Sequence, residues 1–98
     1  MKTKPIKILD ISKEEIICEM SNGEIRSINL NESLEDADKY KKNVLKSDVI
    51  INAKIGDVGQ IYWAEIAVMK DEDGNKISCE YDLSPEFFYE NSSVVEVI

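Results

Sequence analysis

The chain has 98 residues, 43% of them hydrophobic, which is enough for one domain with a modest core and no disulfide or metal to stabilise it. Twenty acidic residues against twelve basic ones give a net charge of −8, which opposes non-specific binding to nucleic acid or to an anionic membrane surface. No apolar run approaches the roughly 20 residues of a membrane span, and the N-terminus lacks the apolar region of a signal peptide. We therefore expect a single domain over residues 1–98, located in the cytoplasm.

The first third of the chain is predicted to form antiparallel strands. Residues 6–11 and 16–20 read as strands, and Asn22-Gly23 separates the second from a third strand-like segment at 25–30. Asn-Gly between two such segments is a strong hairpin signal because both residues tolerate positive φ. The parity of the apolar positions changes twice within these segments, which predicts bulges and a strongly bent sheet.

The main helix is predicted over about residues 33–46. Ser33 and Asp36 resemble a capping box, acidic residues crowd the start of the segment and lysines its end, as the helix dipole favours. A strand with Val49, Ile51 and Ala53 on one face is expected to follow.

The longest predicted strand covers residues 60–70, and because it is apolar on both parities we expect a central strand that is buried on both faces. Residues 71–75 (DEDGN) are acidic, but Gly74 is the fourth residue where a calcium-binding EF-hand loop needs its sixth. A hairpin turn is therefore expected, followed by an alternating strand at 76–83.

The tail is predicted to contain a short C-terminal helix over about residues 84–90. Ser84 suits the N-cap, Pro85 the first helical position, and Leu83 with Phe88 the spacing of a hydrophobic staple. A last short strand is expected within 94–98.

The chain has no histidine, which removes the commonest general base and every His-dependent triad. Cys18 and Cys79 cannot supply the four ligands of a zinc site, and both fall on apolar faces, where buried structural thiols are expected. No glycine-rich phosphate loop occurs. We therefore predict no catalytic residue, no metal site and no cofactor.

Four aromatic residues are candidates for a partner interface. Phe87 and Tyr89 each diverge by about 100° from Phe88 around the predicted helix, so one short helix cannot easily bury all three. Tyr62 and Trp63 lie side by side in the longest strand, where core packing is favoured but stacking on a ligand remains an alternative.

Three sequence blocks resemble, in order, the bacterial domain of unknown function 2442 family: 21–30 (SNGEIRSINL), 59–63 (GQIYW) and 82–89 (DLSPEFFY). The family pattern is a hairpin turn leading to a strand end, a strand ending in Trp, and an Asp-Leu-x-Pro-Asp/Glu helix ending in Tyr. Asn29 stands where the family usually has Asp, and an extra hairpin lies between Trp63 and Asp82. The resemblance implies no established catalytic residues. Some members look like half of a two-gene module that resembles toxin–antitoxin pairs.

Together these observations predict an α+β fold with a bent, mainly antiparallel sheet, one main helix and one short C-terminal helix. They favour a non-enzymatic, acidic protein-interaction domain, the antitoxin-like partner of a basic protein in a two-gene module. One alternative is an acidic mimic of nucleic acid that inhibits a nucleic-acid-binding protein. The other is a small-ligand-binding module around Tyr62 and Trp63.

Overall fold

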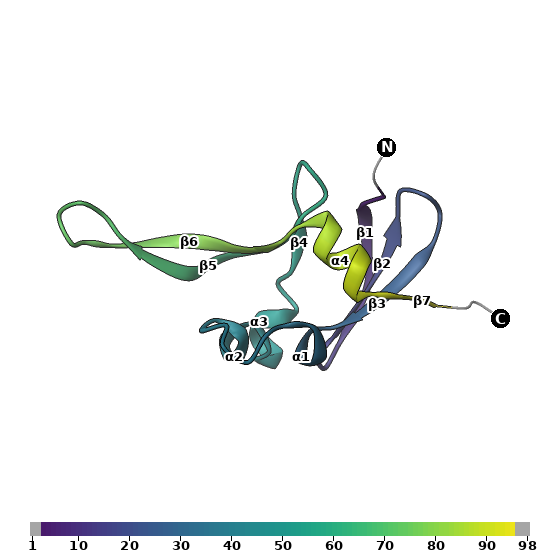
Figure 1. Cartoon of the computed structure of the whole chain (residues 1–98), viewed down its shortest axis with the longest axis horizontal. Coiled ribbons are helices and arrows are strands. Elements are labelled where there is room, and N and C mark those ends of the chain that lie inside the picture. The colour runs from purple at the N-terminus through teal and green to yellow at the C-terminus, as the bar shows by residue number, and fades with distance from the viewer. Residues whose placement is uncertain (1–2, 96–98) are drawn as a thin grey trace.

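The computed structural model describes residues 3–95, apart from the side chains of Glu65 and of residues 67–69. Within that range the chain folds into two antiparallel sheets and four short helices, which confirms the predicted α+β class (Figure 1). The two sheets replace the single bent sheet that the sequence predicted. None of the helices in the described range has the length and apolar character needed to span a membrane.

The first sheet has the order β1-β2-β3-β7, formed by β1 (Pro5–Ser12), β2 (Glu15–Met20), β3 (Ile25–Asn29) and β7 (Ser93–Val94). The second sheet has the order β4-β5-β6, formed by β4 (Lys54–Ile55), β5 (Ile61–Lys70) and β6 (Lys76–Leu83). The helices are α1 (Leu30–Ser33), α2 (Lys41–Val44), α3 (Ser47–Ile50) and α4 (Pro85–Asn91). The last strand is present at its start, whereas Val97 and Ile98 lie outside the described residues.

The predicted hairpin at Asn22-Gly23 joins β2 to β3, but its turn is of a different kind from the one expected. Gly23 has φ +89° and its N–H donates to the Met20 carbonyl at 3.0 Å, whereas Asn22 does not adopt positive φ. The Asn22 side chain instead accepts from the Glu24 N–H at 3.0 Å. The result is a three-residue loop with glycine in the left-handed position. The expected bulges are also present, as two register shifts in the pairing of β1 with β2.

The prediction of one helix over 33–46 is wrong. Asn29 caps a helix that starts at Leu30 and ends at Ser33, because its side chain accepts from the Glu32 N–H at 3.1 Å. The chain is then extended at Leu34, and helix resumes only at α2. Asp38 explains part of the break: its Oδ1 accepts from the Tyr40 N–H at 2.9 Å, a local bond that competes with helix.

The strand predicted from residue 49 is also wrong at its start, where the chain forms α3. The reason is tertiary: Ile50 is 1% exposed, and its carbonyl accepts a hydrogen bond from the Trp63 indole Nε1 at 3.3 Å. Ile51, placed on the buried face by the alternation, is 60% exposed. Only Lys54 and Ile55 enter the sheet.

The core lies between the first sheet, the helices and the base of the second sheet. Its buried members are Ile16, Cys18, Met20, Ile28, Leu30, Leu34, Val44, Ile50, Ile61, Trp63, Leu83 and Phe88. The staple pair Leu83 and Phe88 therefore belongs to the same core, as expected.

Beyond the pair Trp63–Tyr81, β5 and β6 leave the core and continue as a two-stranded arm, residues 64–80 (Figure 1). The molecule is elongated, 54 Å by 28 Å by 21 Å, and the arm lies along its longest dimension. On β6, exposure rises from 5% at Leu83 to 47% at Ile77. The expectation that residues 60–70 are buried on both faces is wrong, since β4 pairs only with Ile61 and Tyr62 and Ala64 is exposed.

Candidate functional site: an acidic groove beside the C-terminal helix

A groove of about 620 Å³ lies between the 33–38 segment, the base of β6 and one side of α4. Three carboxylates line it, those of Glu35, Asp38 and Asp82, and Phe87 contributes a half-buried aromatic ring. Neither lysine nor arginine is among the residues that line it. The groove therefore combines negative charge with an apolar surface.

The α4 wall of the groove follows from local sequence. Ser84 Oγ accepts the Phe87 N–H at 3.0 Å, Pro85 occupies the first turn, and Glu86 complements the positive helix end. Phe88 is fully buried, so the helix is fixed in rotation about its axis. Phe87, about 100° away around the same turn, is thereby directed to the groove.

The opposite wall is held by Asp38 and Tyr81. The Tyr81 hydroxyl donates to Asp38 Oδ2 at 2.5 Å, and the Tyr40 ring packs edge-on against Tyr81 with 5.9 Å between centroids. Burial, with the hydrogen bond and the negative charge of Asp38, raises the pKa of Tyr81 well above its usual value. Tyr81 is therefore a neutral donor at physiological pH, and Asp38 is held in place at the groove.

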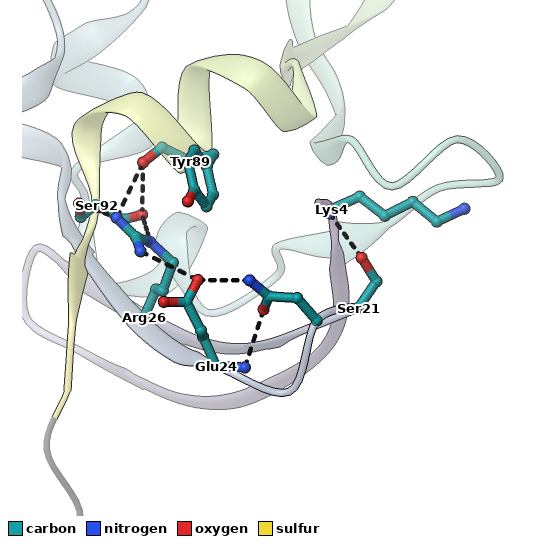
Figure 2. A network of polar contacts seen from close by, with 7 residues as sticks. Lys4, Ser21, Glu24, Arg26, Tyr89 and Ser92 are labelled. Atoms are coloured by element: carbon teal, nitrogen blue, oxygen red, sulfur yellow. Dashed lines mark hydrogen bonds and ion pairs between the residues drawn. The ribbon is translucent and has the colours of Figure 1, made fainter. Parts of the chain in front are cut away.

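The far end of α4 is tied to β3 by Arg26, as Figure 2 shows. Its guanidinium donates to the carbonyls of Tyr89 and Ser92 at 3.3 Å and 2.9 Å, and its Nε donates to Ser92 Oγ at 2.8 Å. Glu24 forms an ion pair with the same guanidinium at 3.3 Å. A cation at the last carbonyls of a helix also complements its dipole.

Tyr89 lies away from the groove. The Arg26 guanidinium stacks on its ring 4.3 Å from the centroid, and the residue is 39% exposed. It borders a separate hollow of about 270 Å³ with Thr3, Glu86 and Glu90. Phe87 and Tyr89 therefore face different surroundings on either side of one helix.

Tyr62 and Trp63 do not form a joint site. Trp63 is 1% exposed and belongs to the core, with its indole N–H bonded to Ile50. Tyr62 is half-buried and, as its neighbour along the strand, points to the opposite face. Of the four aromatic candidates from the sequence, Phe87 is the one that lines the acidic groove.

The thiols occupy contrasting places. Cys18 is completely buried, and burial raises the pKa of its thiol from 9.0 to about 12. Cys79, expected to be buried as well, is half-exposed on the arm. Within residues 3–95 no cluster of three or more potential metal ligands occurs.

Sequence reasoning missed the groove acids, because Glu35, Asp38 and Asp82 come from segments more than 40 residues apart and carry no shared local signal. No protein-family model, curated protein or solved structure matches this chain. The resemblance to the bacterial domain of unknown function 2442 family therefore stays a prediction.

Proposed function

We propose that this chain is a non-enzymatic protein-interaction domain that binds a basic segment of another protein in the acidic groove. The observation that carries the proposal is the groove itself, in which Glu35, Asp38 and Asp82 share one surface with Phe87. An arginine side chain fits that chemistry, because guanidinium pairs with carboxylates and stacks on aromatic rings. The net charge of −8 would speed the encounter with a basic partner.

The identity of the partner is part of the proposal. The three sequence blocks that resemble the domain of unknown function 2442 family suggest a two-gene module, in which this chain is the antitoxin-like, neutralising member in the cytoplasm. The partner would then be the basic product of the adjacent gene.

The distribution of acidic residues favours a protein partner over mimicry of nucleic acid. A mimic needs carboxylates in a regular row, whereas here exposed acids lie on separate elements, among them Glu35 before α2, Glu72 at the arm tip and Glu90 on α4. A ligand-binding module that stacks on Trp63 has no support either, since that ring is in the core.

The test is co-expression with the adjacent gene product, followed by titration of the purified proteins in a calorimeter. Glu35→Lys reverses one charge in the groove, and Glu72→Lys makes the same change at the arm tip, away from the groove. We expect Glu35→Lys to raise Kd about tenfold and Glu72→Lys less than about threefold. Asp82 is left unchanged in this pair of variants because it also lies on the open edge of β6.

Two results would overturn the proposal: the absence of a complex, or equal weakening by both variants. Equal weakening would mean that the partner responds to net charge and not to the groove.

A further inference from the structure

The long, regular, open strand edge within residues 3–95 is that of β6. The other edges carry features that disfavour strand pairing: β1 contains Pro5 and two register shifts, and β4 and β7 have two residues each. The free part of β5 is interrupted by an irregularity between Trp63 and Ala67. β6 has eight residues, pairs with β5 alone and contains no proline.

The turn of the arm decides which backbone groups of β6 face outward. The Asp71 N–H donates to the Asn75 carbonyl at 2.9 Å, so residue 75 pairs inward with β5. Because inward and outward groups alternate along an antiparallel strand, the amides and carbonyls of Lys76, Ser78 and Glu80 face away from β5, as do those of Asp82.

We propose that a second copy of this chain pairs with that edge, β6 antiparallel to β6, about a two-fold axis at Cys79. In this register Lys76 lies opposite Asp82 of the partner subunit, Ser78 opposite Glu80 of the partner subunit, and Ile77 opposite Tyr81 of the partner subunit. The outward-facing residues then form the hydrogen-bonded pairs of the new ladder. The two Cys79 residues face each other as a non-hydrogen-bonded pair.

Charge complementarity argues for this register and this occupant. The Lys76–Asp82 pair occurs twice in the dimer, once on each side of the axis, and no like charges stand directly opposite each other. Moving the axis to Glu80 would set that carboxylate against its own copy. Moving it to Ser78 keeps a Lys76–Glu80 pair but leaves Asp82 outside the ladder and shortens it.

Pairing of the two β6 strands would also stabilise the arm. A two-stranded hairpin alone in water is marginally stable, and Ile77 on this arm is 47% exposed. A two-fold axis at Cys79 would join two arms into one four-stranded antiparallel sheet, and two-fold dimers are the commonest protein assemblies. Tyr81 and Asp82 belong both to this edge and to the groove, whereas Glu35, Asp38 and Phe87 line the groove alone, so variants at Glu35 and Lys76 test the two proposals separately.

The oligomeric state of the full chain, measured by sedimentation equilibrium without any partner protein, is the first test, and we expect a dimer. Lys76→Glu should raise the dimer Kd about tenfold, because it sets like charges opposite each other on both sides of the axis. Adding Asp82→Lys to it should restore the pairing with the charges exchanged. Glu35→Lys in the groove should leave the dimer Kd within about twofold.

Ser78→Pro tests the backbone ladder. It removes an outward N–H and no bond to β5, so the arm should form while the dimer is lost. Far-ultraviolet circular dichroism and the emission of Trp63 check that the variant is folded. If Ser78→Pro does not fold, the comparison of Lys76→Glu with the double variant Lys76→Glu/Asp82→Lys tests the proposed dimer instead.

Cys79 reports the position of the axis. Oxidation by copper–phenanthroline should form a disulfide between the two Cys79 residues; the two thiols give up two protons, and two copper(II) ions take the two electrons. Cys18 is buried and should not react. A monomer throughout, or a dimer that neither cross-links at Cys79 nor responds to Lys76→Glu and its exchange, would overturn the proposal. The groove could still bind a basic partner in that case.

Discussion

The Tyr81 hydroxyl and the Asp38 carboxylate meet at 2.5 Å, across 43 residues of sequence, and join the base of the arm to the segment before α2. Tyr81 packs further against Trp63, with 6.0 Å between ring centroids. This pair therefore holds together the groove, the core and the second sheet.

Replacing Tyr81 with Phe should lower the free energy of unfolding by about 1.5 kcal/mol, since the change deletes one hydrogen bond to a carboxylate and keeps the ring. Urea unfolding monitored by Trp63 emission measures this. Tyr62→Phe is the control at a half-buried ring of the same sheet and should cost less than about 0.5 kcal/mol. Equal losses in both variants would contradict the importance of the Asp38 bond.

The pH dependence of stability should also change in Tyr81→Phe. Folding raises the pKa of Tyr81 above its ordinary value of 10.0, because the folded state favours the neutral phenol. The stability that Tyr81 contributes is therefore complete below about pH 10. This stability is lost as the pH rises above 10. Between about pH 8 and pH 11 the wild type should lose more stability than Tyr81→Phe; parallel losses would be inconsistent with this assignment.

The two thiols should differ in reactivity. With Ellman's reagent at about pH 8, we expect rapid labelling of Cys79 and none of Cys18, whose pKa of about 12 and complete burial leave neither thiolate nor access. Both thiols should react in concentrated guanidinium. A Cys79→Ser variant should remain unlabelled while folded, and labelling of that variant would show that Cys18 is accessible.

Arg26→Ala should destabilise the fold by about 2–3 kcal/mol, because Arg26 donates to two carbonyls at the end of α4 and stacks on Tyr89. Arg26→Lys should recover only part of this, since an ammonium cannot reproduce the forked geometry. Glu24→Gln removes the charge of the half-exposed ion pair and keeps a side-chain oxygen that can accept from Asn22, so it should cost less than about 0.5 kcal/mol. Thermal unfolding followed by circular dichroism ranks the three variants, and a loss in Glu24→Gln as large as that in Arg26→Ala would reverse this order of importance.

Lys13→Gly should stabilise the protein by about 0.5–1 kcal/mol. Lys13 has φ +52° in the turn between β1 and β2, a conformation that costs a side-chain-bearing residue energy and glycine almost none. Lys13→Ala keeps a Cβ and should be nearly neutral. Chemical denaturation of both variants tests this, and a gain in Lys13→Ala would point to charge instead of backbone.

Local signals in the sequence predicted local structure correctly. Ser84 and Pro85 define the start of α4, and Gly23 defines the β2–β3 turn, because capping and positive φ depend on neighbouring residues. The same holds for the acidic turn of the arm, where Gly74 has φ +83°. These features need no knowledge of the rest of the fold.

The errors arose where distant residues decide the outcome. The helical periodicity of 33–46 was overridden by the bonds of Asn29 and Asp38 and by burial of Leu34. Residues 60–70 are apolar on both sides, which predicted a central strand. The neighbouring strand β4 has only two residues, however, so it pairs with β5 only at its base. Neither the groove nor the open edge of β6 could be predicted from the pattern of neighbouring residues, because both depend on how distant segments pack.

Because exposure falls along β6 from 47% at Ile77 to 5% at Leu83, we expect the backbone amides of this one strand to differ widely in their protection from hydrogen exchange. The Ile77 amide, which faces β5, should exchange with deuterated water through brief opening of the arm alone, whereas that of Leu83 should exchange only when the body unfolds. The strand β6 would then connect the part of the molecule that opens most easily with the part whose amides exchange most slowly. We therefore expect the strands of the arm to separate and pair again while the core stays folded.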